Sequence, residues 1–120
     1  MSDAPQLSRV AKNAIRKTLR ANERLLVSAI TAWEIALLVK KQHLDLTMDV
    51  VEWIAATESI EGVQYVPIDH KLAVQSQFLP GEFHADPADR LIVALARQHN
   101  VSLITADERI QQYSQVATIW

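Results

Sequence analysis

The chain has 120 residues, a net charge of −2 and no cysteine, and hydrophobic residues make up 49% of it. This length predicts a single domain over residues 1–120 with room for a real core. Without cysteine the chain has no disulfide framework and no thiolate metal site, which suits a reducing cytoplasm. The charge excludes a strongly basic nucleic-acid binder, and no apolar run is long enough to span a membrane.

Capping residues and apolar spacing predict six helical segments, five of which follow a serine, threonine or aspartate that can cap them. These segments are 9–20, 29–42, 50–58, 70–78, 87–99 and the turn 107–113. Four apolar runs between them are predicted strands, at 24–27, 63–68, 101–105 and 116–120. Strands that alternate with helices predict an α/β fold with a mostly parallel sheet, in which ligands bind at the carboxyl ends of the strands.

The segment 84–92 places two carboxylates in the first turn of a helix that is otherwise built for burial. Asp86 is a natural N-cap and Pro87 fits the first helical position. Asp89 shares its face of the helix with core-type residues at Ile92, Val93 and Ala96. A charge on such a face is costly unless it is compensated, and a metal ion is one form of compensation.

Two more acids fit the same geometry. Glu34 is surrounded by apolar residues in the helix that follows the first strand, so it is predicted to be partly buried. Asp107 comes directly after the strand 101–105, at its carboxyl end. We therefore expect Glu34, Asp89 and Asp107 to converge at one edge of the sheet. An all-oxygen cluster suits Mg²⁺ or Mn²⁺, which can activate water and stabilise the oxyanions of a phosphodiester during cleavage.

Each carboxylate also has a structural explanation. Asp86 can be a helix cap alone, and Asp107 can cap the turn that follows it. Asp89 can be an exposed acid that the helix dipole favours. Two further arrangements use other side chains: an ion pair of Glu34 with Lys41 or Arg90, and a zinc site of His84, Asp86 and Asp89.

Three segments in the same order resemble PIN-domain proteins of the VapC toxin type. They are Leu25 to Ala36 (LLVSAITAWEIA), His84 to Ile92 (HADPADRLI) and Leu103 to Asp107 (LITAD). The ending 116–120 is similar to the last strand of that family. Order and spacing agree along nearly the whole chain.

The resemblance implies a compact three-layer α/β/α sandwich with a central sheet. It implies an endoribonuclease that uses Mg²⁺ or Mn²⁺, the toxin of a bacterial toxin–antitoxin pair, which a small antitoxin inhibits and which is often a homodimer. It implies Glu34, Asp89 and Asp107 as the catalytic metal ligands. Asp86 is a candidate helper, and Thr105 is a candidate hydroxyl near the metal.

One departure from the family concerns the first strand. Family members begin with an apolar strand that ends in an aspartate, whereas residues 1–7 here resemble the loop after that strand, and Asp3 is not assigned as the missing ligand. Three explanations are open: a misassigned start codon, a truncated gene, or a strand supplied by another chain. The alternative function is therefore a degenerate PIN-like domain that binds an antitoxin or RNA without cleaving it.

Overall fold

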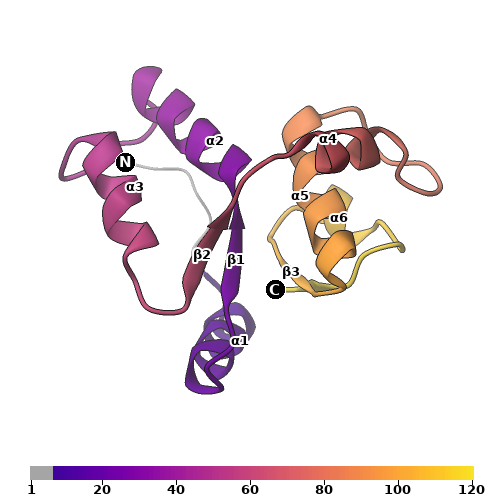
Figure 1. The fold of residues 1–120 in the computed structure, drawn as a ribbon, viewed down its shortest axis with the longest axis horizontal. Helices are drawn as coiled ribbons and strands as arrows, with labels where there is room; N and C mark the ends of the chain where they lie inside the picture. Colours follow the sequence, from indigo (N-terminus) through magenta and orange to yellow (C-terminus); the bar gives the residue numbers. More distant parts are fainter. Residues whose placement is uncertain (1–6) are drawn as a thin grey trace.

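The computed structural model describes residues 7–120, in which helices and strands alternate (Figure 1). Residues 1–6, on which the prediction of a missing first strand falls, lie outside the described residues. The described helices are α1 (Arg9–Arg20), α2 (Ala29–Lys40), α3 (Val50–Glu58), α4 (His70–Gln77), α5 (Pro87–His99) and α6 (Glu108–Gln111). The strands are β1 (Leu25–Ser28), β2 (Val63–Val66), β3 (Leu103–Ile104) and β4 (Thr118–Ile119). None of the described helices has the length and apolarity needed to cross a membrane.

The predicted helix starts are confirmed by the side chains that cap them. Ser8 accepts a hydrogen bond from the Ala11 N–H at 3.0 Å, and Asp69 accepts one from the Leu72 N–H at 2.8 Å. Asp49 caps α3 by accepting a hydrogen bond from the Val51 N–H. Ser28 is both the last residue of β1 and the cap of α2, so the chain passes from strand to helix without a loop. This direct passage places α2 at the carboxyl end of β1.

The strands pair in parallel, as predicted for an α/β fold, but they form two separate pairs. In the first pair Leu25 is in register with Val63, and β1 runs beside β2. In the second, Leu103 is in register with Thr118, and β3 runs beside β4. Within residues 7–120 no strand pairing joins β1 to β3. Only two residues each of the predicted strands 101–105 and 116–120 are paired in a ladder.

The compact core lies in the second half of the chain. Val93 and Leu72 are almost completely buried where α5 packs against α4. Tyr113 belongs to the same cluster, and its hydroxyl donates a hydrogen bond to the carbonyl of Pro80. The remaining members are Leu79, Ala94, Leu95 and Ile110. This core fixes α5 and α6, and therefore the two acids at their N-termini.

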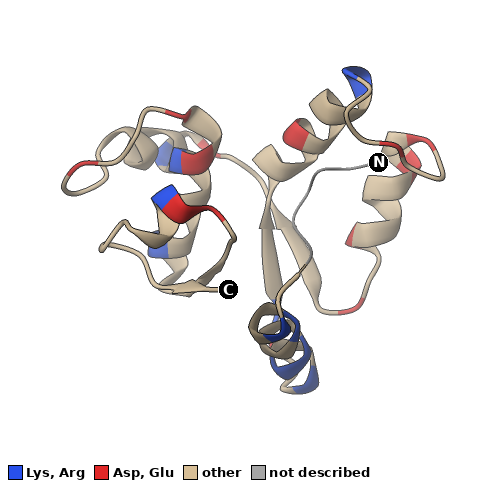
Figure 2. Ribbon diagram, turned by 180° about the vertical axis from the view of Figure 1, so that it is seen from behind, with Lys and Arg blue, Asp and Glu red and all other residues tan. Residues whose placement is uncertain are grey.

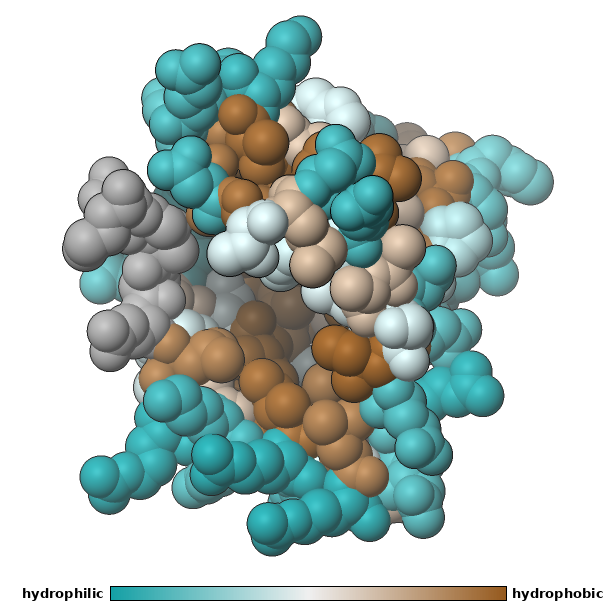
Figure 3. Space-filling model, turned by 90° about the vertical axis from the view of Figure 1, so that its left-hand side faces the viewer, coloured by the Kyte–Doolittle hydropathy of each residue, from teal (hydrophilic) through white to brown (hydrophobic). Residues whose placement is uncertain are grey.

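The first half of the chain is open by comparison. No residue of α2 or α3 is buried, although both helices are mostly apolar. Trp33 on α2 is 59% exposed and Val51 on α3 is 72% exposed. The surface on this side of the molecule is hollowed, with hydrophobic walls (Figure 3). Below it α1 presents a basic face with lysine and arginine residues (Figure 2).

Candidate active site

The three predicted acids occupy three different elements. Glu34 lies on α2, which follows β1; Asp89 lies in the first turn of α5; and Asp107 is the N-cap of α6, two residues beyond Thr105 at the end of β3. Asp89 and Asp107 both line an open cavity of about 560 Å³ between β1 and β3. Glu34, the third predicted acid, is not among the residues that line this cavity.

Glu34 is half-buried, as predicted, and its environment disfavours a charge. Burial raises the pKa of Glu34, and the nearby carboxylates of Asp89 and Asp86 raise it further. Its predicted alternative partner, Arg90, points elsewhere: the guanidinium donates to the carbonyls of Ser76 at 2.9 Å and Phe83 at 3.0 Å. The ion pairs among the described residues include none between Glu34 and Arg90 or Lys41, so this alternative is wrong.

Asp89 is the central acid of the group. Its side chain is only 16% exposed, so the alternative of an exposed first-turn acid is wrong. Burial raises the pKa of Asp89, and the negative charges of Asp86 and Asp107 add to the rise. His84 and Arg109 oppose it, with Nε2 of His84 3.2 Å and Nη2 of Arg109 3.5 Å from the same carboxylate oxygen, Oδ2. The Asp89 carboxylate therefore has both acidic and basic neighbours, and the net result is a raised pKa.

Asp107 is held in its charged form. Burial raises its pKa, but the N–H groups of Ile110 and Arg109, at 3.2 Å and 2.8 Å, and the Arg109 guanidinium outweigh that effect and leave the pKa of Asp107 lowered. The predicted capping role is confirmed, because both N–H groups donate to Oδ1. The other carboxylate oxygen of Asp107, Oδ2, lies 3.5 Å from Nη2 of Arg109. Thr105 Oγ1 accepts a hydrogen bond from the Asp107 N–H at 3.1 Å, which fixes the turn.

Asp86 is a helix cap, as the structural explanation predicts. Its Oδ1 accepts a hydrogen bond from the Asp89 N–H at 3.1 Å, and its residue is exposed. Its own N–H donates to Nδ1 of His84 at 3.3 Å. The cap therefore organises the first turn of α5 and adds negative charge beside Glu34 and Asp89.

Sequence reasoning missed Arg109 as part of this site and treated His84 as a loop residue or a zinc ligand. The signal for Arg109 was its position in the sequence, because a basic residue only two positions after Asp107 lies close to that carboxylate. His84 carried a weaker signal, its position two residues before a cap. Its approach to Asp89 depends on the path of the loop 80–86, to which Arg90 is bonded through the carbonyls of Phe83 and His84.

The donors fit a hard divalent cation in their chemistry. Glu34, Asp89 and Asp107 supply only oxygen, and the mutual repulsion that raises the pKa of the first two is what a cation relieves. Over residues 7–120, however, no three acidic or histidine side chains are grouped closely enough to hold an ion. This holds for Glu34, Asp89 and Asp107 and equally for the predicted zinc alternative of His84, Asp86 and Asp89. The charge of Asp89 contributes to the raised pKa of Glu34, and the charge of Asp107 contributes to the raised pKa of Asp89.

Comparison with known proteins agrees with the fold. The PIN domain family matches residues 4–116, and the chain therefore belongs to the PIN-domain family. It is 32% identical over 121 aligned residues to Ribonuclease VapC22 of Mycobacterium tuberculosis, a match that covers 99% of this chain and 88% of that relative. The resemblance that the three sequence segments indicated is confirmed.

Proposed function

We propose that this protein is an endoribonuclease that hydrolyses RNA phosphodiester bonds with Mg²⁺ or Mn²⁺, and that it is the toxin of a toxin–antitoxin pair. The observation that carries the proposal is that Asp89 and Asp107 line one cavity, with Arg109 Nη2 3.5 Å from both carboxylates, in a chain of the PIN family. The relative named a ribonuclease matches nearly the whole chain. RNA and a cognate antitoxin are the proposed partners, the cytoplasm the proposed location and a homodimer the proposed assembly.

Glu34, Asp89 and Asp107 are the proposed ligands, with Asp86 as a helper through its charge. A bound divalent ion supplies positive charge that makes a water more acidic and offsets charge building on the phosphate. Asp107 is ready for this role because its pKa is already lowered. Glu34 and Asp89 carry raised pKa values, so they bind a cation best once both have lost their protons.

Two neighbouring groups have proposed supporting roles. The Thr105 hydroxyl holds the backbone of Asp107 and so positions its carboxylate. Arg109 lies beside Asp89 and Asp107 and is 60% exposed, which leaves its guanidinium free to reach an incoming phosphate. His84 holds Asp89 from the other side.

Titration of the protein with Mn²⁺ by calorimetry, repeated on Glu34→Gln, tests the ligand assignment. The substitution keeps the shape of the side chain but removes its charge, so we expect Mn²⁺ affinity to fall about tenfold or more. Lys41→Gln, just beyond the end of the same helix, is the matched control and should leave the affinity unchanged. Equal affinity in the wild type and Glu34→Gln would exclude Glu34 as a ligand.

The alternative function is a PIN-like domain that binds an antitoxin or RNA without cleaving. It is favoured by one observation: the acids within residues 7–120 are not grouped tightly enough to hold an ion. A cleavage assay on labelled RNA with Mn²⁺, run beside a binding assay on the same RNA, separates the two functions. Binding without cleavage, at any Mn²⁺ concentration that saturates the protein, would support the alternative.

A further inference from the structure

Helix α1 concentrates positive charge in a chain whose net charge is −2. Five of the 12 lysine and arginine residues lie within its 12 residues, and none of the 14 acidic residues does. Figure 2 shows these basic residues gathered on α1, whereas the acidic residues lie on other elements and loops. The five are Arg9, Lys12, Arg16, Lys17 and Arg20. The charge of the molecule is therefore distributed unevenly over its surface.

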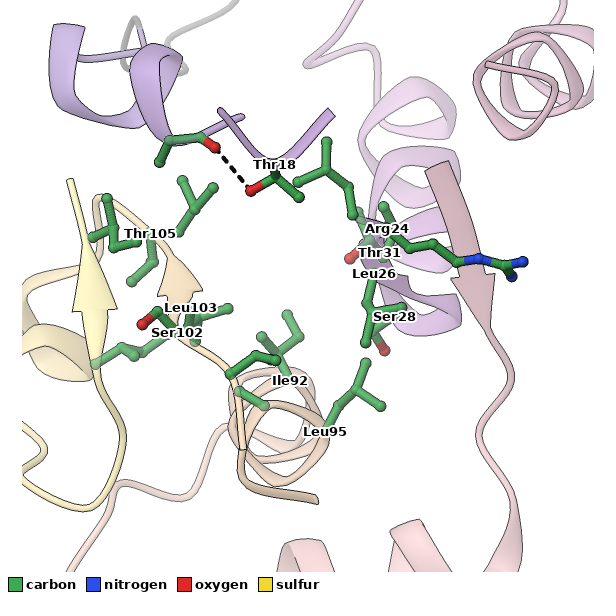
Figure 4. Close-up of a pocket in the computed structure, with 18 of the residues that line it drawn as sticks. Thr18, Arg24, Leu26, Ser28, Thr31, Ile92, Leu95, Ser102, Leu103 and Thr105 are labelled. Atoms are coloured by element: carbon green, nitrogen blue, oxygen red, sulfur yellow. Dashed lines mark hydrogen bonds between the residues drawn. The ribbon is translucent and has the colours of Figure 1, made fainter. Parts of the chain in front are cut away.

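The charges occupy one face of α1, and the packing contacts occupy the other. With about 3.6 residues per turn, the five basic residues and Asn13 fall on one arc of the helix that no apolar residue interrupts. On the opposite face Ala11 is completely buried. Figure 4 shows Thr18 on the cavity side of α1, where its hydroxyl donates a hydrogen bond to the Ala14 carbonyl at 2.9 Å. The basic face therefore points outward, and all five of its charged residues are exposed.

The stability of α1 does not account for this basic face. Among residues 7–120, the ion pairs involve none of the five basic side chains. Lys12 and Arg16 are four residues apart, as are Arg16 and Arg20, so like charges repel one another along the face. Arg9 lies in the first turn, where positive charge opposes the helix dipole, and only Lys17 and Arg20 in the last turn are favoured by it. A negatively charged ligand on this face would relieve the repulsion.

The shape and composition of the basic face define the kind of anion that it fits. Residues 9–20 extend over about 17 Å along the helix axis, which suits a ligand with charges repeated along a line rather than one small anion. The face has no aromatic side chain on which a base could stack and no apolar centre of the kind found in protein interfaces. Insertion into a membrane is excluded, because the apolar side of α1 packs against β1 and β4. The phosphate backbone of a nucleic acid meets these conditions.

The basic face is separate from the acids of the candidate active site. α1 leads into the amino end of β1, whereas α2, which carries Glu34, begins at the carboxyl end of β1 (Figure 1). Thr18 lines the cavity that Asp89 and Asp107 also line, so α1 borders this cavity with its inner side. Over residues 7–120, the cavity lining includes none of the five basic residues of α1. A nucleic acid on the basic face therefore binds outside the cavity, beside the region of the acids.

We propose that the basic face of α1 binds the phosphate backbone of RNA, without regard to base sequence, at a position separate from Glu34, Asp89 and Asp107. The choice of RNA as the nucleic acid rests on the proposed function. An RNA chain held on α1 contacts the protein through nucleotides other than those at the acids. Contacts between lysine or arginine and phosphate need no divalent ion and weaken steeply as the salt concentration rises.

Fluorescence anisotropy of the full chain with a labelled oligouridine of about 20 nucleotides tests the proposal. EDTA is present, so that binding is measured without metal-dependent cleavage. We expect a triple variant, with Arg9→Gln, Lys12→Gln and Arg16→Gln, to weaken binding about tenfold or more. The slope of log Kd against log salt should fall by about 2, which is about 0.7 for each lost phosphate contact. The melting temperature of the variant should not fall, because the substitutions remove like-charge repulsion.

The matched control removes three exposed positive charges from other helices and the end of α2, with Lys40→Gln, Lys41→Gln and Lys71→Gln. It should change the affinity by less than about twofold, because distant exposed charges are screened. Equal losses in the two triple variants would contradict the proposal, since they would show an effect of net charge alone. Displacement of the RNA by polyglutamate at equal charge concentration would overturn it too and assign the face to an acidic protein.

A cleavage assay with Mn²⁺ separates this inference from the proposed function. RNA cleavage by the wild type, with unchanged RNA binding by the α1 variant, would refute the inference and leave the proposed function intact. RNA binding that depends on α1, without cleavage, would support the inference and contradict the proposed function.

Discussion

The two halves of this chain differ in how well they bury their own apolar residues. Among the described residues, every buried hydrophobic side chain except Ala11 lies between Leu72 and Tyr113. α5 contributes five buried residues, whereas α2, of similar length and more apolar, contributes none. A helix that is apolar all round needs neighbours on all sides. The comparison teaches that, among the described residues, the second half of the chain buries its apolar side chains in a core, whereas those of α2 and α3 stay partly exposed.

The largest expected effect is the difference in unfolding free energy lost when an apolar side chain is shortened in each half. Leu72→Ala removes a side chain that is 2% exposed and should lower the free energy of unfolding by about 3 kcal/mol. Val51→Ala, in α3 where the side chain is 72% exposed, should cost less than about 0.5 kcal/mol. Urea denaturation followed by circular dichroism measures both. Similar losses for the two variants would mean that α3 is packed as tightly as the core.

A smaller effect compares one arginine from each half. Arg90→Met leaves the carbonyls of Ser76, Phe83 and His84 without their donor and should cost about 2 kcal/mol, because a charged donor makes stronger bonds. Arg24→Met loses one exposed hydrogen bond to Gln64 and should cost less than about 0.5 kcal/mol. Chemical denaturation of the two variants checks this ranking, and a reversed order would refute it.

The smallest effect concerns pH. The pKa of Glu34 is raised in the folded protein, so folding favours its protonated form, and the stability it contributes is present at low pH and lost as pH rises through the raised pKa. Glu34→Gln should therefore stabilise the protein at pH 7 by about 0.5 kcal/mol, a value discounted for partial exposure. The gain should vanish below the ordinary pKa of a glutamate.

Asp107 gives the opposite sign and serves as the control in the same pH series. Its pKa is lowered by folding, so its contribution is present above its ordinary pKa of 3.8 and lost as pH falls through the lowered value. Asp107→Asn should therefore lose stability at pH 7 rather than gain it. Melting temperatures between about pH 3 and pH 7 distinguish the two acids, and a stabilising Asp107→Asn would contradict this account.

Local sequence signals predicted the helices well because their causes are local. The caps at Ser8, Ser28, Asp69 and Asp86 each bond an N–H two or three residues away, so their effect is contained in a short window. Three of the strands were predicted in place but too long, and the first was predicted one residue too early. A strand extends only as far as its neighbour pairs with it, and that neighbour is remote in the sequence.

The sequence singled out candidate site residues, and these stay a prediction, but it did not predict how they are arranged. The positions of Glu34, Asp89 and Asp107 beside strand ends and on apolar faces singled them out. The effect of Asp107 on the pKa of Asp89, and the position of the Arg109 guanidinium between these two carboxylates, depend on how α5 and α6 pack. The bonds from Arg90 to the loop carbonyls, which remove it as a partner for Glu34, also join segments that no periodicity connects.

The sequence by itself determined the order of the elements, their capping and the family to which the chain belongs, because these depend on neighbours within a few residues or on motif order. Only the tertiary structure decided that the strands form two pairs with a cavity between β1 and β3, and that the core lies in the second half of the chain. Strand pairing and burial are contacts between distant residues. Which strands pair and which side chains are buried therefore depends on how the elements pack against one another.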